Sequence, residues 1–235
     1  MVDDSYDIRY AFNAITNPER LILNHQRQQF DNVTSLNNTF YSNGWISSLP
    51  TFIDYSQITD FSYAFGCMPM LFNVDNLNTS SGEKGEYMFK ECINLQSVNE
   101  LDCTNMTTIH SMFVGCHKLR EVRLKNTGKC IKFGWAFTDC ICLESISELD
   151  ISSLGLSDSY LEWGLDHSCI FDIFTGCKSL KYIKLVGDAT KEQIEMFIDY
   201  LPTYLIEGQD KQLDITGCTN KDQVTATKDT WTIIK

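Results

Sequence analysis

Residues 112–119 read Met-Phe-Val-Gly-Cys-His-Lys-Leu, and the Phe-x-x-Cys-x-x-Leu pattern in them returns along most of the chain. A phenylalanine anchors each copy, at Phe12, Phe40, Phe65, Phe89, Phe113, Phe137 and Phe174. Successive anchors are 28, 25, 24, 24, 24 and 37 residues apart. A nearly constant period of this length is the signature of a repeat architecture, so the sequence predicts about seven stacked units.

Apolar residues keep step with the anchor on both sides. The positions four before, one before and three after each phenylalanine are mostly apolar, and these positions share one face of a helix. We therefore expect a short helix around each anchor. The segment that follows alternates, as in Val122-Arg123-Leu124, which predicts a strand. Where the spacing lengthens, as from Val98 to Leu101, we expect a bend or a bulge.

Cysteine recurs at a fixed place in the pattern. It stands three residues after the anchor at Cys92, Cys116, Cys140 and Cys177. In the copy of Phe65, Cys67 stands two residues after the anchor and Met70 takes the place of the leucine. The ten cysteines contain no CxxC pair, and cysteine is among the most often buried residues. We expect these five positions to form a ladder of reduced, buried thiols, with disulfides between units and metal binding as alternatives. No cofactor is expected.

One helix and one strand cannot bury their own apolar faces, but stacked neighbours can. The sequence therefore predicts an α/β solenoid, a leucine-rich-repeat-like, right-handed stack of short helix-plus-strand coils with a parallel sheet. We expect degenerate repeats at 1–57, regular repeats at 58–187 with an insertion near 154–169, and a C-terminal cap at 188–235.

The expected cap begins with a helix. Thr190 and Gln193 have the spacing of a capping box. The apolar residues after them share one face, and Pro202 stops the helix; these residues are Ile194, Phe197, Ile198 and Leu201. Strands around residues 213–215 and 230–234 would complete a covered end, which the terminal unit of a repeat stack requires.

The repeat resembles the BspA-like leucine-rich repeats, whose signature is Met-Phe-x-x-Cys-x-x-Leu. Residues 112–119 carry it most clearly, and the likeness is strong over 58–185 and weak over 8–52. The resemblance implies a non-enzymatic surface or adhesion module, of a kind found on bacterial cell surfaces, in some protozoa and among predicted phage structural proteins. Residues 1–10 carry three aspartates and no apolar core of a signal peptide. This favours a virion component or a cytoplasmic assembly over a secreted protein.

The net charge and the absence of known motifs disfavour several classes of function. The net charge of −12 disfavours nucleic-acid binding and anionic membrane surfaces, and no stretch approaches the roughly 20 apolar residues of a membrane helix. The four histidines lack metal-ligand spacing, and phosphate-binding glycine motifs are absent. We expect a protein–protein interaction module that does not catalyse a reaction, as a structural part of an assembly such as a phage virion. The alternative is an adhesin for a host surface or glycan.

Two regions are candidate contact sites. Tyr160, Leu161 and Trp163 lie in the insertion, either as interface anchors or as a local core that folds back on itself. Arg120 and Arg123, together with Lys125, make a basic spot on an acidic chain, and Lys184 belongs to the same kind of strand face. A partner's acidic patch would fit these cations, and a solvated face is the alternative.

Overall fold

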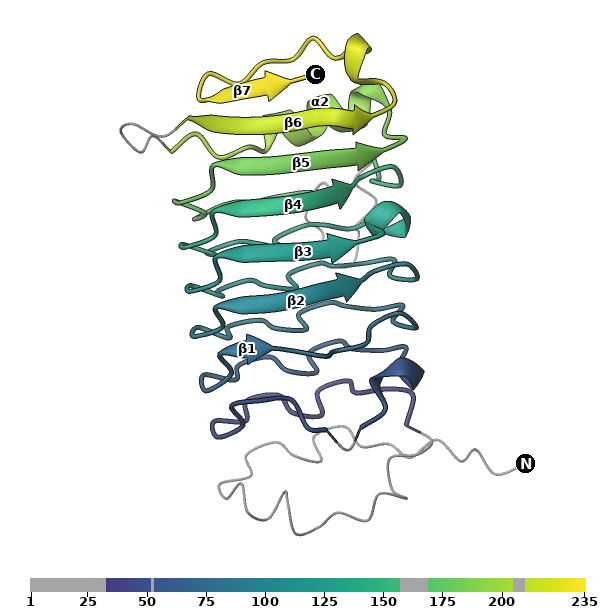
Figure 1. Cartoon of the computed structure of the whole chain (residues 1–235), viewed down its shortest axis with the longest axis vertical. Helices are drawn as coiled ribbons and strands as arrows, with labels where there is room; N and C mark the ends of the chain where they lie inside the picture. The colour runs from purple at the N-terminus through teal and green to yellow at the C-terminus, as the bar shows by residue number, and fades with distance from the viewer. Residues whose placement is uncertain (1–32, 52, 157–168, 205–209) are drawn as a thin grey trace, which may run out of the picture.

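Seven parallel strands lie side by side in the order of the sequence (Figure 1). The computed structural model describes residues 33–51, 53–156, 169–204 and 210–235. The strands are β1 (Asn73–Val74), β2 (Ser97–Asp102), β3 (Glu121–Lys125), β4 (Ser145–Asp150), β5 (Tyr182–Gly187), β6 (Lys211–Cys218) and β7 (Trp231–Ile234). Within the described residues the helical elements are α2 (Lys191–Asp199) and single 3-10 turns at Tyr55–Gln57, Thr127–Lys129 and Lys221–Gln223. The fold is therefore one all-parallel sheet with few helices.

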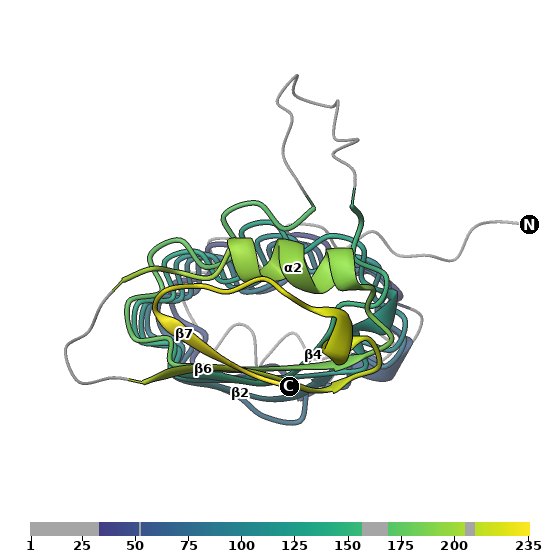
Figure 2. The same ribbon diagram turned by 90° about the horizontal axis from the view of Figure 1, so that it is seen from above.

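The period of the sequence is the step from one layer of the fold to the next. Asn73 pairs with Ser97, Ser97 with Glu121, and Glu121 with Ser145, each 24 residues on. A second run of parallel bridges, away from the sheet, links Ser35, Asp60, Lys84, Thr108 and Lys132 in turn. Seen from above, the layers superpose, with the sheet on one side and α2 on the other (Figure 2). The arrangement is compatible with a repeat solenoid.

The expected bulges are confirmed. The register between β2 and β3 shifts between Val98 and Leu101, and the register between β4 and β5 shifts between Ile146 and Leu149. These are the units with two residues between the apolar strand positions, whereas β3 has one. The extra residue in β2 and β4 leaves the ladder and bends the strand locally.

The prediction of a short helix is wrong for the anchors that the structure describes, from Phe40 to Phe174. Around Phe113 the chain forms consecutive turns in which alternate N–H groups take different partners. The amides of Ser111, Phe113 and Gly115 donate to carbonyls of the next layer at 2.8–2.9 Å. The amides between them donate to carbonyls three residues back, as Val114 does to Ser111 at 3.2 Å. In a helix every N–H would donate to a carbonyl of its own layer. Here alternate N–H groups donate to the next layer, so this ribbon of turns links the layers on the side opposite the sheet.

The turn ribbon needs two residues in the left-handed region of φ in each layer. They stand two before and two after the anchor: Asn38 and Ser42, Tyr63 and Cys67, Tyr87 and Glu91, Ser111 and Gly115, Trp135 and Asp139, Asp172 and Gly176. Their φ values lie between 51° and 80°. Glycine, asparagine and aspartate adopt this conformation most readily.

The anchors form one continuous stack through the core. Phe40, Phe65, Phe89, Phe113, Phe137 and Phe174 lie with ring centroids 5.6–5.9 Å apart and ring planes within 17° of parallel. Each of these rings is at most 1% exposed. Phe197 of α2 closes the stack edge-on, 5.6 Å from Phe174. The anchor positions are thus confirmed from Phe40 onward, while Phe12 lies outside the described residues.

The predicted thiol ladder has one wrong member. Cys92, Cys116, Cys140 and Cys177 are buried, as expected. Cys67 is only half-buried because it occupies the outward, left-handed position of its turn. Met68 fills the buried place instead, and Leu71, rather than the exposed Met70, fills the leucine position. The register of this unit therefore differs by one residue from the one expected. None of the described cysteines forms a disulfide bond.

The C-terminal helix is confirmed with its capping box. The Thr190 hydroxyl accepts from the Gln193 amide at 3.3 Å, and the Gln193 side chain accepts from the Thr190 amide at 2.8 Å. Ile194, Phe197 and Ile198 are fully buried. Strands β6 and β7 extend the parallel sheet beside the helix, as expected from residues 213–215 and 230–234.

Thr190→Ala should destabilise the protein by about 1 kcal/mol, because the Gln193 amide loses its acceptor and the box is broken. Urea unfolding would measure the loss. Thr190→Ser keeps the hydroxyl and is the matched control, with a stability close to wild type. Equal losses in the two variants would mean that the hydroxyl bond does not stabilise the helix.

Candidate interaction surfaces

The thiols of the repeat donate hydrogen bonds within the core. Each donates to the carbonyl of the anchor one layer earlier: Cys92 to Phe65, Cys116 to Phe89, Cys140 to Phe113 and Cys177 to Phe137, at 3.0–3.2 Å. Burial raises the pKa of Cys92 to about 12 and also raises the pKa of the other three. A neutral thiol is a poor nucleophile, so this ladder is a packing device.

Two other kinds of site are a metal centre and a membrane-spanning helix. In the described ranges, no three His, Cys, Asp or Glu side chains gather in a way that could hold a metal ion. Nor does any helix there have the length and apolarity needed to span a bilayer. What remains as candidate sites are surfaces.

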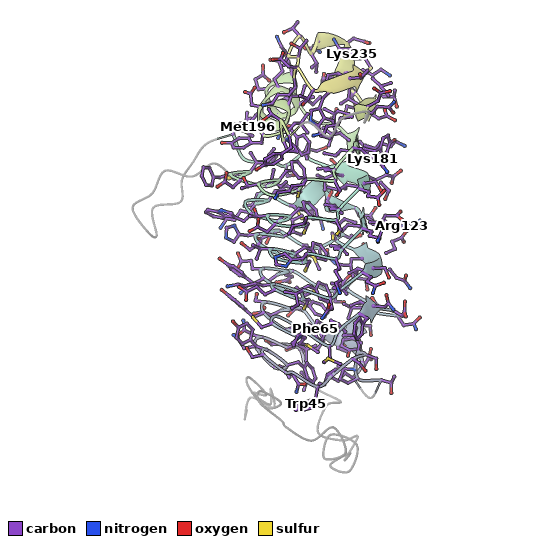
Figure 3. The ribbon with its side chains drawn as sticks, turned by 90° about the vertical axis from the view of Figure 1, so that its left-hand side faces the viewer. Trp45, Phe65, Arg123, Lys181, Met196 and Lys235 are labelled. Atoms are coloured by element: carbon purple, nitrogen blue, oxygen red, sulfur yellow. The ribbon has the colours of Figure 1, made fainter. Side chains whose placement is uncertain are left out.

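The first surface is the outer face of the sheet, where the structure places Arg120, Arg123 and Lys184. Arg120 immediately precedes β3, Arg123 lies in its middle, and Lys184 lies in β5. Figure 3 shows Arg123 and Lys181 projecting from the sheet side of the molecule. The predicted cations therefore share one exposed face.

Carboxylates neutralise these cations. The ion pairs are Arg120–Glu144 at 3.4 Å, Arg123–Glu121 at 2.9 Å, Lys125–Glu100 at 3.3 Å, Lys181–Glu144 at 2.6 Å and Lys184–Glu148 at 3.6 Å. The Lys181 hydrogen bond, followed by the charges of Lys181 and Arg120, lowers the pKa of Glu144. The basic spot expected from the sequence is thus a mixed-charge network, and an acidic partner would meet carboxylates as well as cations.

A hollow of about 330 Å³ lies over β3 within this network. Glu100 lies in β2 and Glu148 in β4, the two bulged strands on either side of β3. The shorter strand β3 carries Glu121, Arg123 and Lys125. Leu124 and Ser147 also line it. The bulges therefore set carboxylates on either side of a strand that carries two cations.

The second surface is a file of rings on the opposite, turn side. Tyr41, Tyr63, Tyr87, His110, Trp135 and Phe171 follow one another across six layers, with ring centroids 4.4–5.8 Å apart. We call these six residues the aromatic ladder. All six are half-buried. Tyr63 and Tyr87 stack nearly parallel at 4.4 Å, and the other contacts are edge-to-face.

Burial and neighbouring groups shift the pKa values of three members of the aromatic ladder, Tyr41, Tyr63 and His110. A hydrogen bond with Cys67, followed by burial, raises the pKa of Tyr41 to about 12. Burial, followed by the charge of Tyr87, raises the pKa of Tyr63 to about 12. Burial, followed by the charge of Lys132, lowers the pKa of His110 to about 4, so its imidazole is neutral and lies 3.2 Å from the Tyr87 hydroxyl.

Sequence reasoning missed the aromatic ladder although part of its signal was visible. Tyr63, Tyr87 and Trp135 all stand two residues before their anchors. His110 and Phe171 stand three before theirs, so no single column of the repeat is aromatic throughout. The contact residues predicted in the insertion, Tyr160, Leu161 and Trp163, lie outside the described residues.

Comparison with known proteins identifies a family. The family described as "Mycoplasma protein of unknown function, DUF285" matches residues 6–127, just over half of the 235 residues. The chain belongs to the DUF285 family. No curated protein and no solved structure matches it. The DUF285 match includes the anchors from Phe12 to Phe113 and four members of the aromatic ladder, from Tyr41 to His110.

Proposed function

We propose that the chain is a right-handed, leucine-rich-repeat-like solenoid of the BspA-like type that binds a protein partner and does not catalyse a reaction. On this proposal it serves as a structural part of a larger assembly, such as a phage virion. The observation that carries the proposal is the aromatic ladder, a half-buried file of rings across six layers. Tyrosine and tryptophan are enriched at the centres of protein interfaces.

The chemistry of the core supports a binding role. The thiols of the four regular layers donate to carbonyls inside the stack, and burial raises their pKa values. The rigid part of the molecule is then a frame that presents side chains at fixed intervals. A stack of this kind offers an extended surface rather than an enclosed pocket.

Co-purification tests the proposed function. The chain, tagged at one end, should retain a companion protein encoded by a neighbouring gene. If every encoded neighbour fails to bind while the chain binds a glycan array, an adhesin replaces the assembly component. A hydrolase or transferase activity abolished by one Cys or His substitution would contradict both proposals.

A further inference from the structure

Three members of the aromatic ladder occupy backbone positions that disfavour them. Tyr63, Tyr87 and Trp135 have φ values of 56°, 56° and 54°. The left-handed region is unfavourable for a bulky side chain, because its Cβ lies close to the following carbonyl oxygen. Residues held in such conformations cluster at functional sites. The strain is therefore a pointer to what these rings do.

The fold does not require aromatic residues at this position. In the layers of Phe40, Phe113 and Phe174 the same position holds Asn38, Ser111 and Asp172, with φ values of 56°, 52° and 51°. Asparagine and aspartate are the residues that this conformation favours. An asparagine at position 63, 87 or 135 would suit the backbone better. Tyr63 and Tyr87 stack on each other at 4.4 Å, and all three residues are only half-buried, so each keeps some area in contact with solvent.

The ladder already holds one cation. Lys90 places its Nζ 5.8 Å from the centroid of the Tyr87 ring and 3.5 Å from a carboxylate oxygen of Glu91. The ammonium group thus contacts both a ring and a carboxylate. Aromatic faces and carboxylates both attract cations. Glu91 is exposed, and three further carboxylates lie on the same turns: Glu86 and Asp172 are half-buried, and Asp139 is exposed. The charge of Glu86 also reaches Tyr63.

We propose that the aromatic ladder is the binding surface, and that it takes a lysine- and arginine-rich extended segment of the protein partner. This rests on the proposed function and specifies its partner. Cationic side chains would sit against the rings as Lys90 does, with the carboxylates of Glu91 and Asp139 beside them. The net charge of −12 draws such a segment toward the molecule.

A sugar chain fits this surface less well. A pyranose ring needs a free, flat aromatic face, but Tyr63 and Tyr87 cover each other at 4.4 Å with only 10° between their planes. An ammonium group is smaller than a sugar ring and needs less of an aromatic face: Nζ of Lys90 lies over the Tyr87 ring, 5.8 Å from its centroid, although Tyr63 stacks on the same ring.

The test replaces the three strained rings by the residue that the chain itself uses at this position. The triple variant Tyr63→Asn, Tyr87→Asn, Trp135→Asn keeps every charge. Calorimetric titration with an octa-arginine peptide at about 150 mM salt, where long-range attraction is screened, should show binding to wild type and roughly tenfold weaker binding to the variant. The control is Trp45→Asn, Phe72→Asn, Tyr204→Asn, which removes exposed aromatics outside the ladder. It should bind as wild type does.

Several results would overturn the inference. If the triple variant bound the peptide with the same affinity as wild type, the binding would come from general attraction between opposite charges and not from the rings. Equal binding of a chito-oligosaccharide would make the surface a glycan site. Circular dichroism and the melting temperature report whether the variant is folded. If it is not, Tyr87→Asn alone should still weaken binding about threefold, and no weakening in that variant would count against the proposal.

Capture of the companion protein separates this inference from the proposed function. If the triple variant loses the companion while the aromatic control retains it, both stand. If the triple variant still captures it and Arg123→Glu on the sheet face does not, the partner binds the sheet; the ladder inference fails and the proposed function survives. If no variant and no wild-type chain captures any companion, the proposed function fails, and the peptide titration still decides whether the ladder binds cations.

Discussion

Replacing Phe113 with alanine is expected to lower the free energy of unfolding by about 3–5 kcal/mol. The ring is fully buried and lies between Phe89 at 5.6 Å and Phe137 at 5.8 Å, so both of its faces are covered. Its removal leaves a cavity in the middle of the stack, and the hydrogen bonds between layers prevent the neighbouring rings from closing it. Such a loss is a large share of the 5–15 kcal/mol that stabilises an ordinary domain.

Urea unfolding followed by circular dichroism measures the loss for Phe113→Ala. Phe72→Ala is the matched control, because Phe72 precedes β1 on the surface and is 36% exposed. The control should lose less than about 1.5 kcal/mol, since less apolar area leaves water at that position. A melting temperature of Phe113→Ala equal to that of wild type would mean that the rings do not form the stack.

The sequence was sufficient to predict the period, the anchors and the strands. Burial selects apolar residues at fixed intervals, so Phe65 and Phe137 occupy the same buried environment three layers apart. The spacing from Val98 to Leu101 even predicted a bulge, because one additional residue between two inward-facing positions has to leave the ladder. The period, the anchors, the strands and the bulges depend on the residues within one layer and on neighbouring layers that repeat the same pattern.

The turn conformation could not be predicted, because the apolar positions alone do not distinguish it from a helix. Phe61, Ala64, Phe65 and Met68 are buried on one side of the ribbon, as they would be on a helix. The difference lies in where the amide of Phe65 donates, to Met88 of the next layer at 3.0 Å. The misplaced Cys67 has the same origin, because a left-handed residue turns its side chain outward.

The aromatic ladder escaped prediction for a geometric reason. Its members come from three different places relative to the anchor: Tyr41 after it, Tyr87 two before it and His110 three before it. They meet because the turns of successive layers place these positions beside one another. The charges on the sheet face were visible in the sequence, but their pairing was not. Arg120 and Lys181 both reach Glu144, which is 24 and 37 residues away from them in the chain.

The stability of the protein is expected to fall steeply between pH 9 and pH 10. Burial raises the pKa of Cys92 and of Cys130 from 9.0 to about 12, and it also raises the pKa of Cys103, Cys116, Cys140 and Cys177. Well below pH 9 these thiols are neutral in both the folded and the unfolded chain, so they contribute no pH dependence to the free energy of unfolding. Above pH 9 the unfolded chain releases their protons and the folded protein retains them. Rising pH therefore favours unfolding.

Each such thiol contributes about 1.4 kcal/mol of lost stability per pH unit above pH 9. Several together should exceed about 4 kcal/mol per unit, which is a large share of the 5–15 kcal/mol that stabilises an ordinary domain. Urea unfolding under a reducing agent at half-unit steps from pH 7.5 to 10 measures the slope. Cys92→Ala should make the slope shallower by about 1.4 kcal/mol per pH unit, whereas Leu95→Met, a buried change without a titratable group, should keep the wild-type slope. A flat profile up to pH 10 would show that the thiols are not held neutral. The buried thiols could then ionise in the folded protein, and an ionised thiol in these positions would be a nucleophile.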